Sequence, residues 1–172
     1  MYRGCQVAHI VAVGKNNEIG VDGGMLWHIP EDFGYFKQMT IGNSLIIGRK
    51  TYEGISPPLT RRCVHVVGKN IPNPTWSCPL RNSLSRASDA CHYLNTNVIF
   101  VAGGSMLYNT TEDIVDILYI TRVPTEFKNA DSFYNMPRGF VLEGEVKIPV
   151  KTKYGLVRFE KWVREYNGEG CA

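Results

Sequence analysis

The chain has 172 residues, of which 44% are hydrophobic and 20% are charged, and this balance excludes a disordered chain. Its net charge of +3 excludes the dense basic face that nucleic-acid binding requires, although it suits a small anionic ligand. The sequence contains no apolar run that approaches the roughly 18 residues of a membrane span. We therefore expect one domain over residues 1–172, with a frayed tail at 167–172, that binds neither nucleic acid nor membrane.

Five cysteines are scattered along the chain, and their number is odd. No two of them have the Cys-x-x-Cys spacing and no cluster of histidines accompanies them, so we expect neither a zinc site nor a disulfide framework. Reduced thiols are typical of the cytoplasm. We therefore expect a cytoplasmic protein without a bound metal, and we expect it to be a monomer.

Short apolar runs predict five buried strands, at residues 7–13, 44–48, 63–67, 98–101 and 117–122. Helices are predicted between them, from Pro30 to about Thr40, over 49–53, over 84–94, and after Gly103-Gly104. Residues 140–163 show an extended pattern instead, with Gly155 near a hairpin turn. The expected fold class is mixed α/β, with a mostly parallel central sheet, flanking helices and an antiparallel C-terminal strand pair.

The segment from Gly23 to Asp32 is a glycine-bearing loop that leads into a helix. Asp32 and Phe36 are four residues apart, so they share one face of that helix. A carboxylate beside a phenyl ring, flanked by apolar residues, is unusual on a face that only packs against a core. Glu31 and Asp32 also suit the positive end of the helix dipole, so a purely structural role stays open.

Two further segments end a buried strand in glycine and then begin a helix. Gly48 is followed by two cations and a threonine, which predicts an anion site, although an ordinary solvated helix start stays open. Gly103-Gly104 lets the backbone approach a phosphate closely, but it is not the Gly-x-Gly-x-x-Gly fingerprint of a Rossmann fold. Two such sites at strand ends indicate one extended, multiply phosphorylated ligand, such as a dinucleotide.

Two cations flank the predicted strand at 63–67. Arg62 precedes the strand, where an arginine can hold a carboxylate through two hydrogen bonds, although a surface cation at a strand end stays open. Lys69 follows the strand and is expected near the second anion site. The pair thus adds a candidate carboxylate clamp and a further basic residue to the predicted ligand site.

Together these segments resemble the dihydrofolate reductase family in residue type, order and spacing. The resemblance extends from about Val7 to about Trp162 and depends on Asn17-Glu18-Ile19-Gly20, Trp27, Pro30-Glu31-Asp32, Phe36-Lys37, Thr40, Gly48-Arg49-Lys50-Thr51, Leu59, Arg62, Gly103-Gly104, Tyr108, Leu118-Tyr119-Ile120-Thr121 and Ala130-Asp131-Ser132-Phe133. It implies an NADPH-dependent oxidoreductase that reduces 7,8-dihydrofolate to 5,6,7,8-tetrahydrofolate, with a hydride added to C6 and a proton to N5. Such a reaction supports one-carbon metabolism and thymidylate synthesis.

The resemblance also implies roles for single residues. Asp32 would hydrogen-bond the pterin ring, Thr121 would touch the same edge through water, and Trp27 belongs to this catalytic group. Substrate contacts are implied for Ile10, Phe36, Ile55 and for Arg62, which would hold the glutamate α-carboxylate. Cofactor contacts are implied for Ala12, Ile19, Gly20, Met25, Gly48, Arg49, Lys50, Thr51, Lys69, Gly103, Gly104 and Ser105.

The family also implies a cis bond between Gly103 and Gly104 and a 2′-phosphate contact at Lys69. The chain departs from the family pattern in four places. Leu26 stands where proline is usual, which leaves the loop less stiff, and Met106 replaces a residue that is often basic. Arg61 stands where glycine is common, and the Ser56-Pro57-Pro58 turn is unusual. Two other functions stay open at this point. One is a riboflavin-pathway-type reductase of the same fold, and the other is a non-catalytic nucleotide-binding module.

Overall fold

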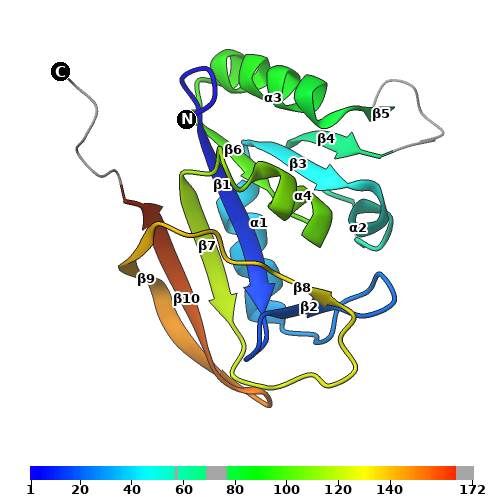
Figure 1. Ribbon diagram of the computed structural model, residues 1–172, viewed down its shortest axis with the longest axis vertical. Helices are drawn as coiled ribbons and strands as arrows, with labels where there is room; N and C mark the ends of the chain where they lie inside the picture. The colour runs from blue at the N-terminus through cyan, green and yellow to red at the C-terminus, as the bar shows by residue number, and fades with distance from the viewer. Residues whose placement is uncertain (57, 69–76, 166–172) are drawn as a thin grey trace.

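A mixed sheet of eight strands forms the centre of the protein in the computed structural model, which describes residues 1–56, 58–68 and 77–165. The strand order is β5-β4-β3-β6-β1-β7-β10-β9, and a second sheet pairs β2 with β8 (Figure 1). The strands are β1 (Gln6–Val13), β2 (Glu18–Gly20), β3 (Ser44–Gly48), β4 (Cys63–Val67), β5 (Ser77–Cys78), β6 (Val98–Val101), β7 (Ile117–Arg122), β8 (Ser132–Phe133), β9 (Phe140–Thr152) and β10 (Gly155–Arg164). The helices are α1 (Pro30–Thr40), α2 (Arg49–Glu53), α3 (Leu80–Leu94) and α4 (Ser105–Thr111).

The direction of strand pairing changes at β7. The pairings from β5 through β7 are parallel, whereas β7–β10 and β10–β9 are antiparallel. Parallel neighbours need a crossover between them, whereas an antiparallel pair needs only a short turn. The turn between β9 and β10 leads into Gly155, whose φ of +104° is a conformation that glycine adopts at little cost. The predicted fold class is thus confirmed in both of its parts.

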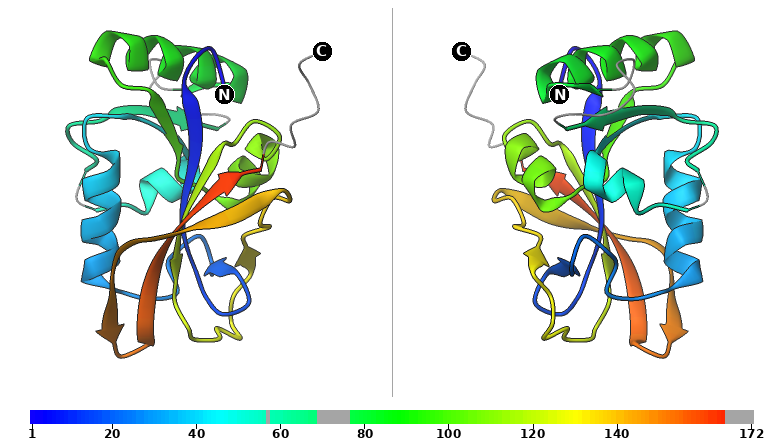
Figure 2. Two further views of the ribbon diagram at one scale, coloured as in Figure 1. Left: turned by 90° about the vertical axis from the view of Figure 1, so that its left-hand side faces the viewer. Right: turned by 90° about the vertical axis from the view of Figure 1, so that its right-hand side faces the viewer.

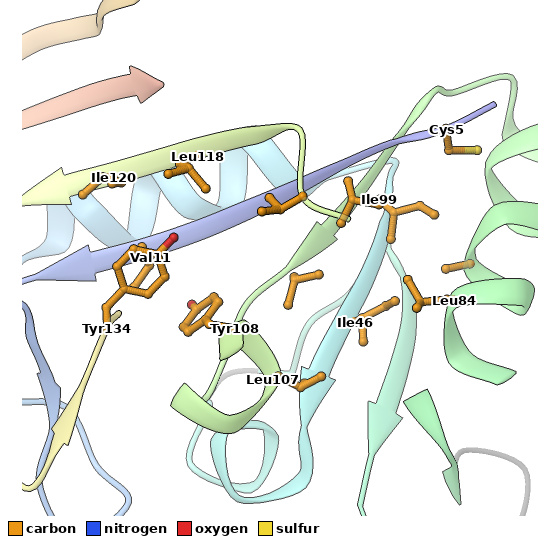
Figure 3. Close-up of a cluster of buried hydrophobic side chains, with 14 of the residues drawn as sticks. Cys5, Val11, Ile46, Leu84, Ile99, Leu107, Tyr108, Leu118, Ile120 and Tyr134 are labelled. Atoms are coloured by element: carbon orange, nitrogen blue, oxygen red, sulfur yellow. The ribbon is translucent and has the colours of Figure 1, made fainter. Parts of the chain in front are cut away.

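Each face of the sheet has its own apolar core. Alternate residues of β1 face opposite sides, so Val11 packs with α3 and α4, whereas Ile10 packs beneath α1. Figure 2 shows α1 and α4 on opposite faces of the sheet. Figure 3 shows the core on the α3 and α4 side, to which Leu84 and Tyr108 contribute. The other core, beneath α1, borders the candidate active site.

Helix α1 begins and ends as its sequence predicts. Pro30 occupies the first turn, where a missing N–H costs nothing, and Lys37 lies in the last turn, near the negative end of the dipole. The Thr40 hydroxyl donates a hydrogen bond to the Phe36 carbonyl at 2.7 Å. These signals are local, which is why the sequence alone predicts both ends of this helix.

Helix α3 begins at Leu80, one turn before the predicted start at Leu84. Its fully buried apolar residues are Leu84, Ala87 and Cys91, and Leu80, one turn earlier, is only partly buried against the same core. The first turn follows Pro79, and after Leu80 it continues with the exposed residues Arg81 and Asn82. The prediction was therefore short by the one turn that lacks a fully buried apolar residue.

The other predicted strands and helices lie within one residue of their expected bounds. Strands β2, β5 and β8 were not predicted, because two or three residues are too few to show an alternating pattern. The predicted tail at 167–172 and Lys69 lie outside the described residues. Within the part of the chain that the structure describes, no helix has the length and apolar character to cross a membrane.

Candidate active site

Asp32 lies in the first turn of α1 with its side chain only 8% exposed, whereas the neighbouring Glu31 is exposed. Successive helix residues are turned by about 100°, so one acid faces the sheet and the other faces solvent. Burial raises the pKa of Asp32 from 3.8 to about 6, although a hydrogen bond from Thr121 and the charge of Lys147 oppose this rise. A carboxyl group with this pKa can hold or release a proton close to neutral pH.

The sheet presents a row of residues to this carboxyl. Thr121 on β7 is buried and pairs in register with Ala12 of β1 on one side and with Phe159 of β10 on the other. Ile10 lies two residues before Ala12 and therefore on the same face of the sheet. The structure thus brings together four residues that the sequence predicts for the site, namely Asp32, Thr121, Ile10 and Ala12.

Two buried polar atoms in the core beneath α1 have no hydrogen-bond partner among the described residues. They are Nε1 of Trp27 and the hydroxyl oxygen of Tyr35. Buried N–H and O–H groups are normally satisfied, so such atoms point to a ligand that completes the site. The sequence predicts Trp27 as a site residue but not Tyr35. Tyr35 lies three residues after Asp32 and therefore on the same side of α1, and this spacing is the sequence signal that could have identified it.

Arg62 and Phe36 also lie together, close to the C-terminal end of α1. The Arg62 guanidinium is 5.7 Å from the centroid of the Phe36 ring. Its Nε donates to the Thr40 hydroxyl at 2.7 Å, and its Nη1 donates to the Thr60 carbonyl at 2.9 Å. These two bonds orient the guanidinium and use two of its five N–H donors, which leaves donors for a carboxylate.

The two glycine segments meet where the adjacent parallel strands β3 and β6 end. The Gly48 N–H donates to the Gly103 carbonyl at 2.7 Å, and the Gly103–Gly104 peptide bond is cis, as the resemblance implies. A Cβ on Gly48 would lie 3.2 Å from that carbonyl oxygen, and one on Gly103 would lie 3.2 Å from the Tyr108 hydroxyl. A Cβ on Gly104 would lie 3.4 Å from Oγ1 of Thr51. Side chains at these glycines would therefore press against the protein itself, so the absence of Cβ atoms lets the two segments approach each other closely.

The remaining predicted cofactor residues are only partly gathered around the junction of Gly48 with Gly103-Gly104. Arg49 faces Glu53 one turn along α2, with 3.9 Å between Nε and the carboxylate. Lys50 is exposed, and Ser105 is the half-buried first residue of α4. The prediction for Lys69 is untested, since that residue lies outside the described ranges. Arg49 thus lies near an acid of its own helix and Lys50 is exposed, whereas Gly48 and Gly103 are joined by a backbone hydrogen bond.

The loop before α1 carries three predicted nicotinamide contacts in different surroundings. Gly20 is buried and its carbonyl accepts a hydrogen bond from the Asp131 N–H at 3.1 Å. Ile19 packs partly against the α3-side core, whereas Met25 is 51% exposed. Ile55, a predicted substrate contact, is half-buried just after α2. The fold therefore anchors the start of this loop and leaves Met25 outside the packed part of the site.

A second buried carboxylate, that of Glu18, lies at the base of the same loop and is 2% exposed. It accepts hydrogen bonds from the backbone N–H groups of Asn16 at 2.6 Å and Phe127 at 2.9 Å. Burial alone would raise the pKa of Glu18, but these hydrogen bonds bring it below its ordinary value. Glu18 therefore ties the loop to the chain around Phe127.

Besides Tyr35, two further residues near the site were not predicted to belong to it. Tyr108 is buried on α4, donates its hydroxyl hydrogen to the Ile10 carbonyl at 2.8 Å and lies against Gly103. It stands one helical turn after the glycine pair, and that spacing could have identified it. Lys147 comes from β9, and no local pattern connects it with Asp32. These surroundings define an α/β protein whose candidate site lies at the carboxyl ends of the sheet strands.

Comparison with known proteins narrows this class. The family profile described as dihydrofolate reductase matches residues 6–150, and the chain belongs to this family. Dihydrofolate reductase of Bacillus subtilis (strain 168) is 36% identical over 127 residues, which are 74% of each chain. Dihydrofolate reductase type 9 of Escherichia coli is 32% identical over 162 residues, which are 90% of each chain.

A solved structure agrees with this assignment. Dihydrofolate reductase from Enterococcus faecalis, complexed with NADP(H) and RAB-propyl, has a TM-score of 0.80 and 26% sequence identity, covering 96% of this chain and 100% of that chain. Membership of the family decides against the two other functions that the sequence leaves open, the riboflavin-pathway-type reductase and the non-catalytic module.

Proposed function

We propose that Asp32 is the acid–base group with which this chain carries out the reaction of its family, the NADPH-dependent reduction of 7,8-dihydrofolate to 5,6,7,8-tetrahydrofolate. The observation that carries this proposal is the buried carboxyl of Asp32, whose pKa is about 6. The reaction adds a proton to N5 while a hydride arrives at C6. A carboxyl group that titrates close to neutral pH suits the control of that proton.

The ionised Asp32 carboxylate offers two acceptor oxygens to the amide-like nitrogen and the amino group of the pterin ring. Thr121 orients the carboxylate through its hydrogen bond and touches the same pterin edge through water. Nε1 of Trp27 and the hydroxyl of Tyr35 are further buried groups with hydrogen-bonding capacity to spare among the described residues. By holding this edge of the ring, Asp32 polarises the ring and controls the protonation of N5.

The rest of the substrate extends away from Asp32 along α1. Phe36 and Ile55 contact the folate, and Ile10 lines the pocket from β1. Arg62 binds the α-carboxylate of the glutamate with the N–H donors that Thr40 and Thr60 leave available. This division puts recognition of the tail on one residue and chemistry on another.

The junction of Gly48 with Gly103-Gly104, where β3 and β6 end, suits a dinucleotide, because backbone without Cβ atoms can approach a phosphate closely. When bound there, NADPH supplies the hydride. The residues that bind its phosphates are Arg49, Lys50, Thr51 and Ser105, with Lys69 at the 2′-phosphate. The residues that surround its nicotinamide are Ala12, Ile19, Gly20 and Met25.

We further propose that the chain is a single domain over residues 1–172 and works as a cytoplasmic monomer that binds folate-type small molecules and no nucleic acid. The odd number of cysteines supports a reducing compartment. The small net charge supports the absence of a nucleic-acid partner.

The test is the rate of NADPH oxidation by the purified chain in the presence of dihydrofolate, for the unchanged protein, Asp32→Asn and Glu31→Gln. Asp32→Asn should lower kcat by about 10²-fold or more at neutral pH, as expected for loss of a positioned acid–base group. Its residual rate should rise at low pH, where the substrate is already protonated at N5. Glu31→Gln, on the exposed side of the same turn, should change kcat little. Near-normal turnover by Asp32→Asn would contradict the proposal.

A further inference from the structure

Lys147 lies on the edge strand β9, but its position in the sheet connects it to the carboxyl in the active site. It pairs in register with Phe159 of β10, and Phe159 pairs with Thr121 of β7. Residues that stand opposite one another across neighbouring strands share a face of the sheet. Lys147 therefore lies in the same row as Thr121, on the face that α1 covers.

The strand is irregular on both sides of Lys147. Register shifts in the β9–β10 pairing fall between Val157 and Phe159 and again between Phe159 and Glu160, so β9 carries an extra residue on each side of the Lys147–Phe159 pair. Bulges of this kind change the direction in which a side chain points, and they are common beside active sites. The backbone is thus shaped locally around this lysine.

The pattern of exposure around Lys147 is the reverse of the usual one. Its apolar neighbours Val146 and Ile148 are 41% and 84% exposed, whereas Lys147 itself is half-buried. Its ammonium lies 4.6 Å from the centroid of the Phe159 ring, a cation–π distance. The Lys147 side chain is thus directed toward the buried Phe159 ring and not wholly into water.

Two other cations of the same hairpin, Lys161 and Arg158, are paired with acids. Lys161 Nζ lies 2.6 Å from the Glu143 carboxylate, and Arg158 Nη1 lies 2.6 Å from that of Glu145. None of the ion pairs among the described residues includes Lys147. Its charge is therefore not cancelled by a neighbouring acid there, and it can act on the carboxyl across the row.

We propose that Lys147 is a positioning residue that favours the ionised form of the Asp32 carboxyl and so shifts the pH range over which this enzyme works toward lower pH. The inference rests on the proposed role of Asp32 and extends it to a residue that no local motif identifies. Asp32 accepts its hydrogen bond from Thr121, and Lys147 acts through space rather than by touching the substrate.

Lys147 differs in charge from the other described groups around Asp32. Tyr35 from its own helix and Tyr108 from α4 are neutral phenols. Burial is the main cause that raises the pKa of each hydroxyl, and the negative charge of Asp32 is a smaller cause in the same direction. Strands β1 and β10 present apolar residues to this face. Lys147 is the cation, among the described residues, whose charge lowers the pKa of Asp32.

The test compares Lys147→Met, which keeps the apolar stem but removes the charge, with Lys147→Arg, which keeps the charge. Lys151→Met serves as a matched control, because Lys151 is an exposed lysine of the same strand. Two quantities are measured: the pKa of the Asp32 carboxyl in the ligand-free protein by ¹³C NMR, and the midpoint of the pH profile of kcat. Removing a nearby cation makes ionisation harder, so both should rise in Lys147→Met, by roughly half a pH unit or more.

Lys147→Arg should restore both values, and Lys151→Met should leave them unchanged. An unchanged Asp32 pKa in Lys147→Met, or an equal rise in Lys151→Met, would overturn the proposal, and so would lower turnover at every pH with no movement of the midpoint. The NMR titration does not depend on catalysis. A moved pKa with an unmoved pH profile would therefore place the error in the role given to Asp32 instead.

Discussion

Asp32 at the start of α1 and Glu18 at the base of the preceding loop are both buried carboxylates, but their pKa values move in opposite directions. Burial disfavours the charge of both. Glu18 compensates with backbone N–H groups from Asn16 and Phe127, whereas Asp32 has the hydroxyl of Thr121 and the charge of Lys147. The difference teaches that the number of donors, together with the depth of burial, separates a structural carboxylate from one that keeps acceptors for a ligand.

The largest expected effect on stability comes from removing the buried negative charge of Asp32. The pKa of Asp32 is about 6 in the folded chain against 3.8 ordinarily, so its contribution to stability is present below pH 3.8 and lost as the pH rises through 6. Asp32→Asn should therefore raise the free energy of unfolding of the ligand-free protein at pH 7.5, by up to about 3 kcal/mol. Urea unfolding at pH 7.5 and at pH 3.5 measures this. An equal gain at both pH values would contradict the reasoning.

Arg62 is intermediate between the two carboxylates, because some of its N–H donors are occupied within the protein and others are available to a ligand. Arg62 is oriented by Thr40 and Thr60 but keeps N–H donors for a carboxylate, so Arg62→Leu should weaken folate binding by roughly 1.5–3 kcal/mol. The measurement is the Kd for folate by fluorescence titration. A pterin that lacks the glutamate is the control, and it should bind almost as before. Equal losses for the two ligands would show that Arg62 only supports the fold.

The satisfied carboxylate should respond in the opposite sense to Asp32. Glu18→Gln places an amide N–H₂ where an N–H now donates, so it should lower the free energy of unfolding at pH 7 by roughly 1–3 kcal/mol. Because the folded pKa of Glu18 is below its ordinary 4.5, its stabilisation is present above pH 4.5 and lost as the pH falls through the folded pKa. Thermal unfolding at pH 7 and at low pH should show the deficit narrowing in acid. If Glu18→Gln is as stable as the parent at pH 7, the proposed difference between Glu18 and Asp32 is wrong.

The smallest effect is expected in the loop between the two carboxylates. Leu26 is not among the described non-glycine residues with positive φ, so proline suits the sign of its backbone angle. Leu26→Pro should stabilise the protein by about 0.4–1 kcal/mol, through a less flexible unfolded chain, and should change kcat more than stability because the loop borders the site. Stopped-flow kinetics and Tm together check this. Unchanged turnover would show that the loop tolerates either residue.

Much of this molecule could be predicted locally. The helix at Asp32 was predicted because proline, acids and a basic last turn occur together within 11 residues, and β1 because its apolar run is continuous. Helix α3 was predicted one turn short, because its first turn contributes little to the apolar stripe. The roles of Asp32, Arg62 and the glycines at the site stay predictions until they are measured. Their burial and contacts are facts of the fold.

The sequence by itself determined the fold class, the family and the residue types of the site, since strand–helix alternation and motif spacing are properties of short segments. Only the tertiary structure decided which segments meet. It joined Gly48 to Gly103 through the parallel pairing of β3 and β6, turned Lys147 toward the row that contains Thr121, and left Met25 exposed. The physical reason is that hydrogen bonding between strands brings together residues far apart in the chain, and no local pattern encodes that register.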